Sequence, residues 1–118
     1  MSVAIVFETH ATSTDNEAGI ATGWLPGELS ETGLRQAVEL GERRRGGGFA
    51  AVFTSDLART VRTADIAFAG TEVRIHHDPR LRECNYGRLN GAPPRRDPLV
   101  ARPPARRGEP CRARLRAV

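Results

Sequence analysis

The sequence predicts an α/β fold in which parallel strands are covered by helices. Three short apolar runs of strand length, at residues 3–7, 49–53 and 71–75, alternate with two segments of helical periodicity. This alternation is typical of a parallel sheet whose strands are joined by right-handed helical crossovers. In such sheets, functional side chains gather beyond the carboxyl ends of the strands.

The first run, Val3 to Phe7, is continuously apolar and rich in β-branched residues, which predicts a strand buried on both faces. It has no positively charged flank or small-residue cleavage site, and it ends at Glu8, too early to cross a bilayer. The two cysteines, Cys84 and Cys111, match no CxxC or zinc-ligand spacing, so we expect reduced thiols. These features together predict a cytoplasmic protein.

A helix is predicted from Gly33 to Arg45. Residues 9–31 before it are polar and turn-rich, and Ser30 or Thr32 supplies an N-cap. Apolar residues recur at helical spacing within the segment, and three consecutive glycines end it.

A second helix is predicted after the strand at residues 49–53. Ser55 or Asp56 offers a cap, the apolar positions continue to about Phe68, and Gly70 ends the helix. The third strand, at residues 71–75, follows directly, which completes the expected strand–helix–strand unit.

Charge is divided unequally along the 118 residues. The chain has 18 basic residues, all of them arginine, and 14 acidic ones, for a net charge of +4. Residues 1–90 carry a net charge of −2 and residues 91–118 carry +6. Because only 5% of the residues are aromatic, there are few platforms on which bases could stack. We therefore expect no nucleic-acid partner, and an arginine-rich arm with salt-sensitive affinity is the alternative for residues 91–118.

The composition changes near residue 92. Residues 93–118 are rich in arginine and proline and show no apolar period, so we expect a disordered tail. Such a composition is also what a GC-rich gene gives when it is read out of frame. We hypothesise a frameshift or truncation product, which translation of the downstream DNA in the other two frames would test.

Three positions form a candidate site for phosphoryl transfer. His10 follows the first strand, Arg59 lies in the turn after the second, and Glu83 lies in the segment after the third. A histidine can act as nucleophile, an arginine fork can hold phosphate oxygens, and a carboxyl group can protonate a leaving oxygen. Each has a structural explanation when taken alone, whereas the set in this order indicates chemistry on a phosphate ester.

Four sequence blocks carry a resemblance to a known family. They are Glu8-Thr9-His10-Ala11 with the polar residues after it, Leu29 to Ala37, Ser55-Asp56-Leu57-Ala58-Arg59, and Leu81 to Gly91. In content and order, residues 3–92 resemble the histidine phosphatase superfamily, the phosphoglycerate mutase-like family. The resemblance implies that residues 1–92 form part of a three-layer phosphoglycerate mutase-like domain, a sheet with flanking helices, and that residues 93–118 are a tail.

The resemblance also implies a two-step mechanism without a metal or another cofactor. A small phosphorylated metabolite would transfer its phosphoryl group to His10, while Arg59 and Asn16 would bind the phosphoryl oxygens. Glu83 would act as general acid toward the leaving oxygen and then as base for the attacking water. Phosphatase and mutase activities both stay open, and no membrane partner is expected.

Two departures from the family pattern predict impaired catalysis. Thr9 stands where the family has an arginine, and its hydroxyl lacks the charge and the fork of a guanidinium. The loss is expected to cost about 3 kcal/mol of transition-state stabilisation, roughly a hundredfold in rate. The family's second catalytic histidine has no counterpart after Asn90, and we expect His76 and His77 in an exposed loop. A non-catalytic phosphoryl-binding fragment that self-associates through an unpaired sheet edge is therefore the alternative.

Overall fold

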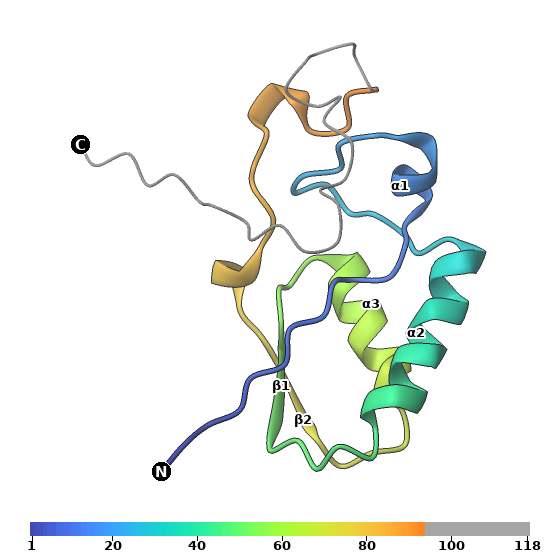
Figure 1. Cartoon of the computed structure of the whole chain (residues 1–118). Coiled ribbons are helices and arrows are strands. Elements are labelled where there is room, and N and C mark those ends of the chain that lie inside the picture. The colour runs from blue at the N-terminus through green and yellow to red at the C-terminus, as the bar shows by residue number, and fades with distance from the viewer. Residues whose placement is uncertain (94–118) are drawn as a thin grey trace, which may run out of the picture.

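The computed structural model describes residues 1–93 of the chain (Figure 1). In chain order its elements are α1 (Thr14–Ala18), α2 (Glu31–Arg44), β1 (Ala51–Thr54), α3 (Ala58–Ala67), β2 (Arg74–His77) and the short 3-10 helices η1 (Pro79–Leu81) and η2 (Gly87–Leu89). The predicted α/β class is confirmed. The tail expected from residue 93 lies, apart from Pro93, outside the described residues.

The sheet of the described part consists of β1 and β2, which pair in parallel. Ala51 lies opposite Arg74 and Thr54 lies opposite His77, and α3 forms the crossover between the two strands. Both strands begin two or three residues later than the sequence predicted. Helices α2 and α3 pack against each other, and α3 contacts β1 (Figure 1). The carboxyl ends of both strands therefore point to the end of the molecule that carries the site.

Helix α2 confirms the predicted helix and its Ser30 cap. The Ser30 hydroxyl accepts a hydrogen bond of 3.1 Å from the amide of Gly33, and two arginines in the last turn complement the helix dipole. The buried face repeats at helical spacing and consists largely of small residues: Gly33, Ala37, Leu40 and Gly41. Small side chains here allow α2 to lie close to its neighbours.

Helix α3 begins at Ala58, one or two residues later than a cap at Ser55 or Asp56 would place its start. Leu57 is the N-cap residue and provides no side-chain cap. The Ser55 hydroxyl lies 2.6 Å from that of Thr60, and the Asp56 carboxylate pairs with Arg82. The prediction of a Ser55 or Asp56 cap was therefore wrong: the Ser55 hydroxyl contacts the Thr60 hydroxyl in the first turn, and the Asp56 carboxylate is paired with Arg82.

The prediction of a buried strand at Val3 to Phe7 was also wrong. This segment has no regular secondary structure, and Val3 and Phe7 are 83% and 88% exposed. An apolar run becomes a strand only where another strand satisfies its backbone, and among residues 1–93 none hydrogen-bonds to it. Contacts with the helices begin at Glu8, whose carboxylate accepts a 2.6 Å bond from Arg44.

The expectation of a histidine-bearing loop before the Glu83 block needs correction as well. His76 and His77 are exposed, as expected, but they form the end of β2. The His76 ring stacks on Phe53 of β1, with 5.0 Å between the ring centroids. Within the described part of the chain, no helix is long and apolar enough to cross a membrane.

Candidate functional site

His10 lies where the N-terminal segment reaches helix α3, and its ring is oriented by the backbone. Its Nδ1 is 2.7 Å from the carbonyl oxygen of Ala11. Because a carbonyl oxygen only accepts hydrogen bonds, Nδ1 must carry the proton, which leaves the lone pair of the neutral imidazole on Nε2. A histidine in this tautomer can act as a nucleophile through Nε2.

A short chain of hydrogen bonds connects the His10 segment to Arg59. The Ala11 amide donates to the Thr63 hydroxyl at 3.0 Å, and that hydroxyl donates to the Arg59 carbonyl oxygen at 2.7 Å. Thr63 is buried, as is Ala11. The backbone beside the candidate nucleophile is therefore fixed to the helix that carries the candidate phosphate ligand.

His10 lines a cavity of about 460 Å³ between the N-terminal segment and α2. The other lining residues are mostly polar: Glu8, Thr9, Ala11, Thr12, Gln36, Glu39, Leu40, Arg43 and Thr63. Of the site residues expected from the sequence, only His10 lines this cavity. Within residues 1–93, no group of three or more histidine, cysteine or acidic side chains is placed to hold a metal ion.

Arg59 is buried, with 3% of its surface exposed, and it faces a loop rather than a carboxylate. Its Nη2 donates a hydrogen bond of 2.9 Å to the Gly23 carbonyl oxygen, and Nη1 donates one of 3.4 Å to that of Leu25. We name residues 21–27 the Gly23 loop. No carboxylate within residues 1–93 lies within 4.0 Å of the guanidinium. A buried cation bonded only to neutral carbonyls favours a nearby anion.

Asn16, the second expected phosphate ligand, has a structural role at the start of α1. Its Oδ1 accepts hydrogen bonds of 2.9 Å from the amide and from the hydroxyl of Ser13, and that hydroxyl caps the Asn16 amide. The Asn16 side-chain NH₂ group makes no hydrogen bond within the described part. Only this half of the amide is free to donate to a ligand.

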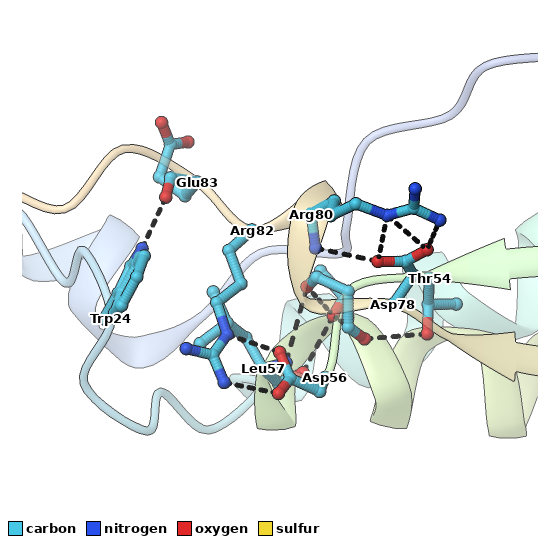
Figure 2. A network of polar contacts seen from close by, with 10 residues as sticks. Trp24, Thr54, Asp56, Leu57, Asp78, Arg80, Arg82 and Glu83 are labelled. Atoms are coloured by element: carbon cyan, nitrogen blue, oxygen red, sulfur yellow. Dashed lines mark hydrogen bonds and ion pairs between the residues drawn. The ribbon is translucent and has the colours of Figure 1, made fainter.

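Glu83 lies in the irregular stretch between η1 and η2, and we name residues 79–92 the Glu83 segment. Its carboxylate Oε1 accepts a bond of 2.9 Å from the Cys84 amide, and its carbonyl oxygen accepts one of 2.7 Å from Trp24 Nε1 (Figure 2). The Cys84 thiol is free and exposed. The glutamate side chain itself is exposed.

Tyr86 lies beside the candidate site, a placement that sequence reasoning missed. Burial raises the pKa of its phenol, the charges of Glu83 and Cys84 raise this pKa further, and the positive charge of Arg59 opposes them. A Cβ added at Gly23 would lie 3.0 Å from the tyrosine ring. The phenol is therefore near both Arg59 and Glu83, and the only signal in the sequence is its place in the Leu81 to Gly91 block.

The structure brings the Gly23 loop and the Glu83 segment together at one end of the molecule. The Gly91 amide donates to the Ala21 carbonyl at 2.7 Å, and the Ala21 amide donates to that of Ala92 at 3.3 Å. In Figure 1 these segments lie beside α1, beyond the carboxyl ends of the strands. No hydrogen bond within the described range joins His10 directly to Arg59 or Glu83.

Comparison with known proteins places this chain in a family. Residues 5–110 match the sequence profile of the histidine phosphatase superfamily, branch 1. The chain is 36% identical over 94 residues to the 2,3-bisphosphoglycerate-dependent phosphoglycerate mutase of Streptococcus agalactiae. This match covers 75% of this chain and 41% of that protein. The chain thus spans about two-fifths of the length of the curated relatives it matches.

Two solved structures extend the similarity to the fold. The phosphoglycerate mutase of Bacillus anthracis superposes with a TM-score of 0.67 at 26% identity, over 71% of this chain and 38% of that one. A mycobacterial glucosyl-3-phosphoglycerate phosphatase superposes with a TM-score of 0.62 at 33% identity, over 71% and 42%. Similar proteins thus include both a mutase and a phosphatase. On the extent of the matched profile, the chain belongs to the histidine phosphatase superfamily, branch 1.

Proposed function

We propose that this chain accepts the phosphoryl group of a small phosphomonoester on Nε2 of His10. The observation that carries the proposal is the bond between His10 Nδ1 and the Ala11 carbonyl, which keeps the Nε2 lone pair available. In the first step the P–O bond to the ester oxygen breaks and a P–N bond to His10 forms. In the second step water attacks phosphorus, the P–N bond breaks and inorganic phosphate leaves.

Arg59 and Asn16 would bind the phosphoryl oxygens. The buried guanidinium has no carboxylate partner in the described part, and its carbonyl bonds leave further N–H donors for an anion. Such a preorganised cation stabilises the charge that spreads over the equatorial oxygens during transfer. Asn16 would add a neutral donor through its free NH₂ group.

Glu83 would donate its proton to the leaving alkoxide and later accept one from the attacking water. Its carboxylate turns back onto the Cys84 amide, so this bond would have to open for proton transfer. Catalytic hydrogen bonds often form only in the substrate complex, and this geometry is compatible with the role.

The proposed substrate class is supported by the names of the similar proteins. The Streptococcus agalactiae protein is named as a phosphoglycerate mutase and the mycobacterial one as a glucosyl-3-phosphoglycerate phosphatase. We propose a small phosphorylated metabolite of this type, hydrolysed rather than isomerised, in the cytoplasm. Turnover is expected to be slow, because Thr9 beside His10 supplies no positive charge.

The second candidate is a phosphoryl-binding fragment without turnover that self-associates. It is favoured by Thr9 and by exposed apolar side chains, Val3 and Phe7 in the N-terminal segment and Phe53 in β1. Sedimentation velocity tests the association: a single monomeric species over a range of protein concentrations would exclude it.

Phosphoryl transfer is tested by incubating the chain with an isotopically labelled aryl phosphate. We expect phosphate that is labile in acid and stable in base, absent in His10→Ala and retained in His76→Ala, which alters an exposed histidine outside the site. Label that persists in His10→Ala would refute the proposal. Binding of phosphate without labelling, even in Thr9→Arg, would favour the second candidate.

A further inference from the structure

We propose that Trp24, supported by the ion pair between Asp56 and Arg82, is a positioning residue for Glu83. The inference rests on the proposed function, since it assigns the acid of that mechanism its placement. Glu83 is exposed and lies outside regular secondary structure, so neither a helix nor a strand sets its position. Side chains from elsewhere in the chain have to do so.

Trp24, the only tryptophan, bonds directly to the backbone of the acid. Its indole Nε1 donates to the Glu83 carbonyl oxygen at 2.7 Å across 59 positions of sequence. The Arg82 guanidinium lies over its ring, with Cζ 4.7 Å from the ring centroid (Figure 2). Trp24 thus contacts the acid and the residue immediately before it.

Arg82 is in turn fixed to the start of α3. Its Nε and Nη2 both donate to the Asp56 carboxylate, a two-point bond that sets the plane of the guanidinium (Figure 2). The Arg82 and Asp56 side chains are 29% and 31% exposed, whereas the neighbouring Arg80 is 89% exposed in its pair with Asp78. Asp56 lies in the same turn as Arg59, the phosphate ligand.

A second set of hydrogen bonds, from Arg59, fixes the backbone on both sides of Trp24. Arg59 holds the carbonyl oxygens of Gly23 and Leu25, the two residues that flank the tryptophan. The acid and the phosphate ligand are therefore joined by two routes, one through Arg82 and Asp56 and one through the Gly23 loop. Displacing a catalytic group by about 1 Å can lower a rate by roughly a hundredfold, so these two sets of contacts matter for catalysis.

A purely structural role for Trp24 is the alternative. However, backbone bonds between Ala21 and residues 91 and 92 attach the Glu83 segment to its neighbour without the tryptophan. The indole bond is thus not needed to keep the segment in place as a whole. Its specific effect is at the acid.

The test compares two phosphate donors that differ in their need for an acid. The 4-nitrophenolate group of 4-nitrophenyl phosphate leaves without a proton, whereas the alkoxide of glycerol phosphate requires one. We expect Trp24→Phe, which keeps a ring and removes the N–H, to slow His10 phosphorylation by glycerol phosphate roughly ten- to hundredfold. The rate with 4-nitrophenyl phosphate should not change. Arg82→Gln should behave like Trp24→Phe, and Glu83→Gln should show a larger loss with glycerol phosphate than either, because it removes the acid itself.

Arg80→Gln is the matched control, because it removes an exposed ion pair from the same segment, and it should alter neither rate. Equal losses with both donors in Trp24→Phe, or no loss with either, would overturn the positioning role while leaving the proposed function intact. If the wild-type chain takes a phosphoryl group from neither donor, the proposed function fails and this inference falls with it.

A measurement that does not depend on activity tests whether Arg82 supports Trp24. The single indole N–H gives one cross-peak in a ¹H–¹⁵N spectrum, and we expect slow solvent exchange in the wild type and in Arg80→Gln. Arg82→Gln should accelerate this exchange, and Arg82→Lys should restore it only in part, because a lysine lacks the planar fork. Unchanged exchange in Arg82→Gln would show that Arg82 does not support Trp24.

Discussion

The Arg59 guanidinium donates a hydrogen bond of 2.9 Å to the carbonyl oxygen of Gly23, 36 positions away in the sequence. Arg59, which is expected to bind phosphate, therefore also anchors the loop that contains Trp24. Its burial removes it from water, and its partners are neutral. An anion at this place would find a charge already oriented, so binding would require little reorganisation.

Replacing Arg59 with lysine should weaken both the fold and anion binding. A lysine cannot donate to both loop carbonyls in the geometry of a guanidinium, and one buried acceptor would lose its partner. We expect a loss of about 1–3 kcal/mol in the free energy of unfolding, measured in urea, and weaker phosphate binding by calorimetry. Arg62→Lys, on the exposed side of α3, is the control. Equal stability and affinity in both variants would contradict this interpretation.

Introducing an arginine at Thr9 should raise the rate of His10 phosphorylation. The added guanidinium would restore a second positive fork beside the nucleophile, and one such donor is worth roughly a hundredfold in rate. The measurement is the time course of label incorporation from 4-nitrophenyl phosphate. Ser2→Arg adds the same charge at an exposed position away from the cavity and should have no effect. If both variants react faster than the wild type by the same factor, the acceleration comes from net charge and not from a guanidinium at position 9.

Packing between α2 and α3 should tolerate no side chain at Gly41. A Cβ there would lie 2.4 Å from the carbonyl oxygen of Ala67, so Gly41→Ala should cost about 1–3 kcal/mol in urea unfolding. Gly46→Ala is the matched control after the same helix, because no atom lies within 4 Å of its added Cβ and its φ is not positive. It should be neutral or slightly stabilising. A stable Gly41→Ala would show that the helices can separate without cost.

The environment of Trp24 should respond to acid through Asp56. The hydrogen bond from Arg82 is the main cause that lowers the pKa of Asp56 below its ordinary value of 3.8. Because the pKa is depressed in the folded state, the pair is complete above the ordinary value and is lost as pH falls through the folded value. Trp24 fluorescence should therefore show a transition below about pH 4 that is absent in Asp56→Asn.

Asp78 provides the control for this titration. Its hydrogen bonds with Arg80 lower its pKa to about 2, so it too titrates below its ordinary value. Within residues 1–93 no hydrogen bond joins Asp78 to Trp24, and Asp78→Asn should keep the fluorescence transition. Loss of the transition in Asp78→Asn but not in Asp56→Asn would contradict the assignment.

The sequence predicted the part of the fold that depends on local patterns. Apolar runs at residues 49–53 and 71–75 flank a segment of helical period, and the strands found there, Ala51–Thr54 and Arg74–His77, do pair in parallel. The run at residues 3–7 has the same pattern, but pairing depends on a partner strand that local composition cannot supply. The predicted caps at the start of α3 failed because Asp56 is paired with Arg82, 26 positions away.

The candidate site was predictable to the same extent. Short blocks around His10, Arg59 and Glu83 identify the family, and their order is a sequence property. The roles of these three residues in catalysis, and those of Asn16 and Thr9, stay predictions. The bond between Trp24 and the Glu83 carbonyl has no local sequence signature, because a side chain meets a backbone atom far along the chain. Only the structure could reveal this bond.

The most direct test of phosphoryl transfer to Nε2 is the position of the phosphoryl group on the His10 ring. After reaction of ¹⁵N-histidine-labelled chain with 4-nitrophenyl phosphate, ¹⁵N and ³¹P spectra distinguish phosphorylation at Nε2 from that at Nδ1. Since Nδ1–H is bonded to the Ala11 carbonyl, we predict a single Nε2-phosphorylated histidine, lost in His10→Ala. Phosphate on Nδ1 of His10, or on another residue, would contradict it.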